Sequence, residues 1–227
     1  MSLSAIVFDF DGVIANSEPL HFLAFRDELA AHGVALSEAD YYATYLGYDD
    51  AGAFRAMGAA NGSSWDAARI AAMVASKARR MEELERDVSV LFPGAADAIR
   101  RAAAAVPIAI ASGALSAEIR RTLDREQLTH HFTAIVGADH TEASKPAPDP
   151  YLRALDLLSS SARAPLRANE CVALEDSRWG LVSARAAGLR TIGVAQTYPA
   201  SSLTDADLVI CSISEFDINT AHSLCLT

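Results

Sequence analysis

The chain has 227 residues, of which 51% are hydrophobic and 21% are charged, a composition typical of a globular protein with a sizeable core. A formal net charge of −10 without any basic block excludes non-specific nucleic-acid binding, because nothing would neutralise a row of phosphates. The sequence has no apolar run of membrane length, no signal peptide and too few cysteines for a disulfide framework, so we expect a cytoplasmic protein without membrane partners.

The first predicted element is a buried strand from Ala5 to Phe8, which ends directly before Asp9-Phe10-Asp11-Gly12. In open parallel sheets, ligands bind at the carboxyl ends of the strands. Two carboxylates this close ionise together only beside a cation, and otherwise one of them keeps a proton. The motif therefore indicates a site for a hard divalent metal, or a nucleophile paired with a proton donor. An ordinary Asp-Gly turn is an equally good explanation of the motif taken alone.

The following residues up to about 87 have helical patterns and little strand character. The predicted helices are Glu18 to His32, Ser37 to Leu46, Asp50 to Ala60 and Trp65 to Glu85. Because this block follows the first strand, we expect it to lie over the carboxyl edge of the sheet as a lid that excludes water. A packed helical appendage without such a role is the alternative.

Strands and helices alternate in the rest of the chain. The predicted strands are Pro107 to Ala111, Thr133 to Val136, Cys171 to Leu174, Thr191 to Ala195 and Leu208 to Ile210. The predicted helices are Ala95 to Ala105, Leu115 to Arg125, Pro150 to Leu158 and Arg178 to Ala187. This βαβ series predicts an α/β fold with a mostly parallel sheet flanked by helices.

Further polar groups follow the later strands. Ser112 and Gly113 offer a hydroxyl and backbone N–H groups at the start of a helix, which suits an anion. Glu175 and Asp176 form a second acidic pair, and two acidic strand ends together indicate a magnesium site. Lys145 is one of two lysines beside seventeen arginines and lies in a proline-rich loop. Taken singly, Ser112 and Gly113 are also explained as a turn or helix cap, and Asp176 as a helix-capping residue. Lys145 alone is also explained as a solvated loop lysine.

The combination is more specific than its parts. Strand-DFDGV, strand-SG, KPAPDPY and strand-EDS, in this order, resemble the four motifs of the haloacid dehalogenase superfamily. The resemblance covers essentially the whole chain and is to the branch with a helical cap, which includes β-phosphoglucomutase and phosphoglycolate-type phosphatases. It implies a Rossmann-like core formed by residues 1–16 and 88–227, with a helical cap domain at 17–87.

The resemblance also implies catalytic roles and a metal. Asp9 would be the nucleophile that forms an aspartyl-phosphate, and Asp11 the acid that protonates the leaving oxygen and then activates water. Mg²⁺ would be held by Asp9, the backbone carbonyl of Asp11 and Asp176, with Glu175 in support. The expected activity is magnesium-dependent hydrolysis of a small phosphorylated metabolite, a sugar phosphate or a phosphoglycolate-like acid. The second aspartate favours phosphate esters over haloacids.

Other residues would contact the phosphate or select the substrate. Ser112, Gly113 and Lys145 would grip the phosphoryl group. His21 has the spacing from the first motif at which β-phosphoglucomutase carries a cap histidine, and Lys77 falls where related enzymes carry a cap lysine. For His21 the alternative is a helix-flank histidine beside an aromatic stripe. For Lys77 it is a solvated helix residue.

One position favours a phosphatase over a mutase. Aligned on Gly47, this chain has Asp50 where the mutase carries an arginine that holds a second phosphate, and a carboxylate would repel that phosphate. A β-phosphoglucomutase-like mutase and a catalytically silent phospho-ligand-binding protein remain alternatives. A signalling receiver domain fits less well, because it is shorter and lacks the two-aspartate spacing and the helical insertion. The oligomeric state is not indicated by the sequence.

Overall fold

A computed structural model of the chain describes residues 2–45, 48–86, 88–162 and 165–226. The chain folds into two compact units. Unit 1 contains residues 1–16 and 90–227, and unit 2 contains residues 17–89. Within the described ranges, no helix combines the length and the apolar character needed to cross a membrane.

Unit 1 is built on a parallel sheet with the strand order β3-β2-β1-β4-β5-β6 in the described residues. The strands are β1 (Ala5–Phe8), β2 (Ile108–Ala111), β3 (Phe132–Val136), β4 (Cys171–Glu175), β5 (Arg190–Val194) and β6 (Leu208–Ile210). This finding confirms the predicted α/β fold. The strand order reverses between β1 and β4, and such a switch point opens a crevice at the carboxyl ends of the strands.

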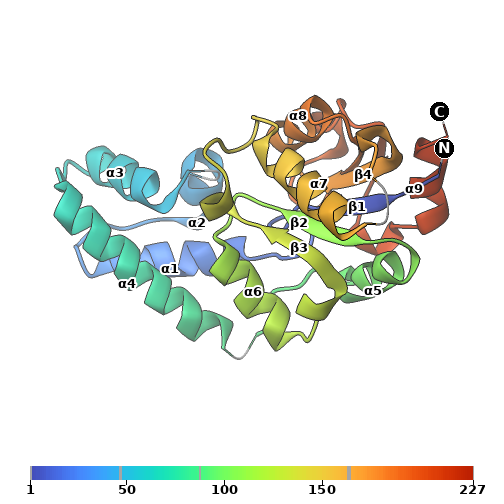
Figure 1. The fold of residues 1–227 in the computed structure, drawn as a ribbon. Coiled ribbons are helices and arrows are strands. Elements are labelled where there is room, and N and C mark those ends of the chain that lie inside the picture. Colours follow the sequence, from blue (N-terminus) through green and yellow to red (C-terminus); the bar gives the residue numbers. More distant parts are fainter. Residues whose placement is uncertain (1, 46–47, 87, 163–164, 227) are drawn as a thin grey trace. The chain divides into compact units, whose positions relative to one another are not determined.

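Helices cover both faces of the sheet, with α7 and α8 on one face and α5 and α6 on the other (Figure 1). Their bounds, with those of the last helix, are α5 (Ala95–Ala105), α6 (Ser116–Arg125), α7 (Asp149–Ser161), α8 (Arg178–Ala186) and α9 (Ile218–Leu224). Alternate strand residues such as Val7 and Ala173 pack against Tyr151 and Leu158 of α7 in one buried cluster. Strands buried on both faces explain why their sequences lack polar alternation.

Unit 2 is helical in the residues that the structure describes. It contains α1 (Glu18–Ala30), α2 (Glu38–Asp40), α3 (Asp50–Ala60) and α4 (Ala67–Glu85). Its core gathers the aromatic stripe of α1 with residues of α3 and α4, including Phe25, Phe54 and Met73. The stripe beside His21 consists of Phe22, Phe25 and Leu29, and it is the buried face of α1.

One local difference from the sequence prediction lies between residues 38 and 45. In place of one continuous helix, the short α2 is followed by a π-helical turn, Tyr41–Tyr45. The ring of Tyr41 packs against Phe22 and Phe25, and its hydroxyl donates to Glu18, so tertiary contacts fix this turn. Leu46 and Gly47, where the helix was expected to stop, lie outside the described residues.

Candidate active site

Two acidic strand ends lie side by side because β1 and β4 are neighbours in the sheet. The register pairs Phe8 with Leu174, and the backbone N–H of Asp9 donates to the carbonyl of Leu174 at 2.9 Å. Asp9, Glu175 and Asp176 each offer one carboxylate oxygen, and these oxygens lie within 4.8 Å of one another. The structure therefore brings together three of the predicted site residues, at the switch point of the sheet.

Lys145 joins this acidic cluster from a loop that precedes α7. Its Nζ lies 2.9 Å from Oδ1 of Asp9 and 2.5 Å from Oε1 of Glu175. The side chain is only 11% exposed, so the alternative of a solvated loop lysine is wrong. Prolines at 146, 148 and 150 restrict the backbone that carries the ammonium group.

Glu175 is completely buried, and its carboxylate accepts hydrogen bonds at both oxygens. Oε1 accepts from Lys145 Nζ and, at 2.7 Å, from the hydroxyl of Tyr151. Oε2 accepts from the backbone N–H of Ser177 at 3.4 Å and from its hydroxyl at 3.2 Å. A buried carboxylate needs such partners, because an unpaired charge is expensive to bury.

Burial and mutual repulsion raise the pKa values of Asp9 and Asp176. Burial and the nearby Glu175 raise the pKa of Asp9 from 3.8 to about 7, although Lys145 opposes the shift. Burial and Asp9 raise the pKa of Asp176 well above its usual value. Burial opposes the charge on Lys145, but Asp9 and Glu175 outweigh it and raise the pKa of its ammonium group above the ordinary value.

The chemistry of this cluster suits a hard divalent cation. The converging ligands are all carboxylate oxygens, which Mg²⁺ prefers. Three carboxylates beside one ammonium leave an excess of negative charge that one divalent cation would balance. Gly12 borders the same place, because a Cβ at this residue would overlap the Asp176 carboxylate. The residues present therefore fit Mg²⁺.

Asp11 lies two residues beyond Asp9, after the end of β1. It forms an isolated bridge with Ala15 and is partly exposed. Its charge is close enough to contribute, as the smallest of the causes, to the raised pKa of Asp9. The carboxylate of Asp9 also accepts from the backbone N–H of Phe10 at 2.7 Å, which fixes its orientation.

Ser112 and Gly113 follow β2, which neighbours β1 on the side away from β4. Ser112 is buried, and its hydroxyl accepts from the backbone N–H of Ala114 at 3.1 Å. Gly113 is exposed, and a Cβ there would meet no atom within 4 Å. These two residues thus lie at the same edge of the sheet as the acidic cluster, with open space beside Gly113.

The predicted substrate residues of unit 2 meet in a cluster of their own. Lys77 of α4 lies 2.6 Å from Oδ1 of Asp50 on α3 and 2.7 Å from Nδ1 of His21 on α1. Its ammonium group also sits 4.6 Å from the centre of the Phe25 ring. Because Lys77 is 2% exposed, the alternative of a solvated helix residue is wrong.

This cluster changes the interpretation of two residues. Burial and the neighbouring Lys77 lower the pKa of His21 to about 3, so its ring is neutral and accepts from Lys77 at Nδ1. Asp50 was expected to be a carboxylate that repels a second phosphate. In the structure its charge is paired with the ammonium group of Lys77.

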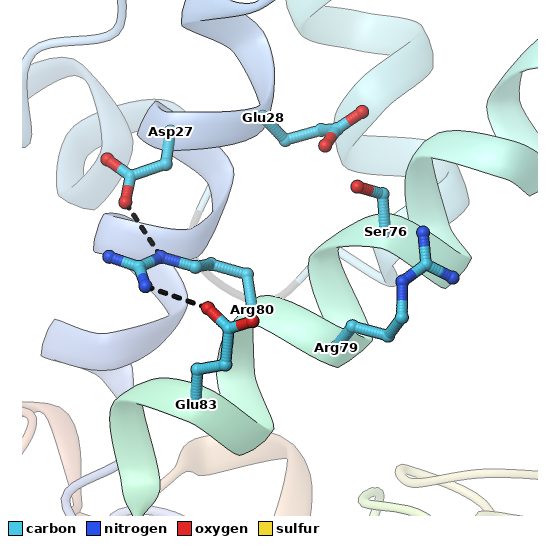
Figure 2. Close-up of a pocket in the computed structure, with 6 residues that line it drawn as sticks. All are labelled: Asp27, Glu28, Ser76, Arg79, Arg80 and Glu83. Atoms are coloured by element: carbon cyan, nitrogen blue, oxygen red, sulfur yellow. Dashed lines mark hydrogen bonds and ion pairs between the residues drawn. The ribbon is translucent and has the colours of Figure 1, made fainter.

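Unit 2 also has a surface hollow between α1 and α4, lined by residues other than the predicted site residues. Its lining is charged apart from one serine and comprises Asp27, Glu28, Ser76, Arg79, Arg80 and Glu83 (Figure 2). Arg80 donates across the hollow to Asp27 of α1 and along α4 to Glu83, at 3.0 Å in each case. Arg80 and its two carboxylate partners are exposed and paired with one another, so we assign the hollow no chemistry.

Sequence reasoning missed several residues that support the site. Tyr151 stood out only as part of a motif, although its hydroxyl contacts Glu175. Ser177 donates to the same carboxylate, and Thr197 hydrogen-bonds to Asp176. For Tyr151, the one signal in the sequence was its position six residues after Lys145. A helix that begins between these two residues can direct the Tyr151 side chain toward the sheet.

The chain is similar to known proteins over most of its length. Residues 6–194 match the haloacid dehalogenase-like hydrolase family. Protein CbbY of Rhodobacter capsulatus is 37% identical over 200 residues, which cover 85% of this chain and 85% of that protein. Fructose-1-phosphate phosphatase YqaB of Escherichia coli is 31% identical over 202 residues, covering 84% of this chain and 96% of that protein.

A solved structure shares both fold and sequence with the chain. It is that of a CbbY mutant from Rhodobacter sphaeroides in complex with xylulose-1,5-bisphosphate. The identity is 27% and the TM-score 0.78, with 95% of this chain and 96% of that chain covered.

Proposed function

The chain belongs to the haloacid dehalogenase-like hydrolase family, and we propose that it is a magnesium-dependent phosphatase of small sugar phosphates or phosphoglycolate-like acids. The observation that supports this most strongly is the contact of Lys145 with Asp9 beside two further carboxylates. This arrangement combines a nucleophile, a positive group for a phosphoryl oxygen and ligands for a divalent metal.

In the first half of the proposed reaction, an oxygen of Asp9 attacks phosphorus and the bond to the ester oxygen breaks. Asp11 gives its proton to that oxygen, so the alcohol leaves in neutral form. Lys145 and the groups at Ser112 and Gly113 hold the phosphoryl oxygens while this happens. The product is an aspartyl-phosphate on Asp9.

In the second half, Asp11 takes a proton from water, and the resulting hydroxide attacks phosphorus. The bond between phosphorus and Asp9 then breaks, which releases inorganic phosphate and restores the free carboxylate. Mg²⁺ bound by Asp9, Asp176 and the backbone carbonyl of Asp11 would neutralise negative charge on the nucleophile and the phosphoryl group. Glu175 supports this arrangement through its contact with Lys145.

The relatives support sugar phosphates as the substrate class. One relative is named for fructose 1-phosphate, and the similar CbbY structure holds a pentulose bisphosphate. Unit 2 is the proposed cap, and we include its residues His21 and Lys77 in substrate selection. Because the charge of Lys77 is already paired with Asp50, unit 2 offers hydrogen-bonding groups there with no excess of positive charge.

The test compares the wild-type chain with Asp9→Asn, using an aryl phosphate and a panel of phosphorylated sugars and acids. We expect turnover that requires Mg²⁺, is lost in EDTA and falls at least about a thousandfold in the variant, because an amide cannot act as the nucleophile. Asp156→Asn changes an exposed acid of α7 in the same way and is expected to keep full activity.

Three outcomes would contradict the proposal. Turnover that survives in Asp9→Asn rules out the covalent role of Asp9. Binding of sugar phosphates without any turnover indicates a silent binding protein. Conversion of β-glucose 1-phosphate to the 6-phosphate without phosphate release indicates a mutase.

A further inference from the structure

Tyr151 lies beneath the site in a position that none of the proposed steps uses. It is the third residue of α7 and is completely buried. Its hydroxyl donates to Oε1 of Glu175 at 2.7 Å, and its ring centre lies 5.2 Å from the ammonium group of Lys145. Burial and the charge of Glu175 raise the pKa of the phenol well above its ordinary value, so the hydroxyl keeps the proton that it donates.

The contacts form one connected path to the nucleophile. Tyr151 and Lys145 share a single acceptor, Oε1 of Glu175, and Lys145 then reaches Oδ1 of Asp9 at 2.9 Å. Ser177 occupies the other oxygen of Glu175. The orientation of the Glu175 carboxylate therefore depends on Tyr151 at one oxygen and on Ser177 at the other. The position of the Lys145 ammonium group depends in turn on the orientation of that carboxylate.

We propose that Tyr151 is a positioning residue: its hydroxyl orients Glu175, and through Glu175 it holds Lys145 against Asp9. Its link to turnover rests on the proposed function, whereas its effect on Lys145 does not. Without the hydroxyl, the carboxylate loses one of its two donors at Oε1 and is held at that oxygen by Lys145 alone. Lys145 then loses a fixed partner, although the ring beneath it remains in Tyr151→Phe.

The chain allows a direct measurement, because Lys77 and Lys145 are its only lysines. Labelling lysine with ¹⁵N gives at most two side-chain ammonium resonances, which Lys145→Arg assigns. In Tyr151→Phe we expect the ammonium hydrogens of Lys145 to exchange roughly tenfold faster, as for loss of one hydrogen bond to a charged group. Lys77, which is 2% exposed against 11% for Lys145 and is paired with Asp50, serves as the internal reference and should change less than about twofold.

Activity gives the second measurement. We expect kcat/KM of Tyr151→Phe for a phosphate monoester to fall roughly tenfold, because a small displacement of a positioned group is costly for the reaction. Leu158→Ala is the control for a purely structural effect. Leu158 is buried in the same helix and the same core cluster, so its truncation lowers stability without altering the Lys145 resonance.

The outcomes separate this inference from the proposed function. An unchanged Lys145 exchange rate in Tyr151→Phe, or unchanged kcat/KM beside an active wild type, overturns the role of Tyr151. If Tyr151→Phe does not fold, Tyr151→Met, which also lacks the hydroxyl, replaces it and must give the same faster exchange at Lys145. If the wild type hydrolyses no phosphate ester, the proposed function fails, and the exchange measurement still decides whether Tyr151 holds Lys145.

Discussion

At the scale of single residues, Glu175 keeps its place because residue 180 has no side chain. Gly180 lies in the first turns of α8, and a Cβ at this position would overlap the Glu175 carboxylate. Glycine inside a helix is less favourable than alanine by about 1 kcal/mol, so α8 alone does not explain its presence. The glycine makes room for a charge that is buried beside Lys145 and Tyr151.

Gly180→Ala should therefore affect activity far more than stability. The added methyl group displaces the Glu175 carboxylate and with it Lys145, so we expect kcat/KM for a phosphate monoester to fall at least about tenfold. The better helix propensity of alanine offsets part of the loss of stability. Enzyme assays and thermal unfolding of the same sample measure the two effects.

The opposite substitution, alanine to glycine, at another position of α8 is the matched control. Ala186 is exposed and is the last residue of α8, so Ala186→Gly should cost less than about 1 kcal/mol of stability while leaving activity per folded molecule unchanged. Full activity of Gly180→Ala would show that the position of Glu175 is unimportant.

The sequence located the site but not its internal contacts. Asp9, Glu175 and Asp176 were predictable as neighbours, because acidic residues that follow buried parallel strands meet at one edge of the sheet. The pairing of Lys145 with Glu175 spans 30 residues, and that of Tyr151 with Glu175 spans 24. Such partners follow from how α7 packs on the sheet, which no local pattern specifies.

At the scale of elements, unit 2 joins three helices through one buried ammonium group. Lys77 of α4 contacts Asp50 of α3 and His21 of α1, and its side chain is 2% exposed whereas that of Asp50 is 32% exposed. The two partners of the ion pair therefore differ in their access to water. Losing Lys77 leaves a carboxylate that water can still reach, whereas losing Asp50 leaves a buried cation.

This asymmetry predicts that Asp50→Asn destabilises the chain more than Lys77→Met. For Asp50→Asn we expect a loss of about 2 kcal/mol in the free energy of unfolding, since a buried charge loses its counterion. For Lys77→Met the loss should be smaller, because methionine is of similar length and can keep an apolar contact with Phe25. Chemical denaturation of the full chain gives the ranking, and hydrogen exchange assigns the loss to α3 and α4.

An exposed pair in the same unit supplies the control. Asp27 and Arg80 connect α1 and α4 at 3.0 Å, but both side chains are at least 31% exposed. Asp27→Asn should change stability by less than about 1 kcal/mol, as is usual for surface ion pairs. If Asp50→Asn costs no more than this control, the buried pair contributes little to unit 2.

At the scale of the whole molecule, the alternation of strands and helices was enough to predict the parallel sheet. The predicted strand Leu208 to Ile210 and the helices Asp50 to Ala60 and Ala95 to Ala105 have the same bounds in the structure. The seven-residue α9 was missed, because a helix of two turns has too few residues for a clear periodicity. The π-helical turn depends on contacts of Tyr41 that local sequence does not encode.

The order of the strands links global stability to the proposed metal site. Asp9 and Asp176 come together only when β1 and β4 pair, so the unfolded chain has no comparable cation site. A cation that binds the folded state alone stabilises it by about 2.7 kcal/mol at a concentration a hundred times its Kd. We therefore expect Mg²⁺ to raise the melting temperature of the wild type above its value in EDTA.

Asp176→Asn should reverse this pattern. In EDTA the variant should melt at least as high as the wild type, because it removes one of the crowded carboxylates whose ionisation burial opposes. Addition of Mg²⁺ should then give little further increase, since a ligand is missing. Asp156→Asn, an exposed acid paired with Arg153, should keep the wild-type response to Mg²⁺. Equal Mg²⁺ stabilisation of all three proteins would mean that the cation binds somewhere other than the ends of β1 and β4.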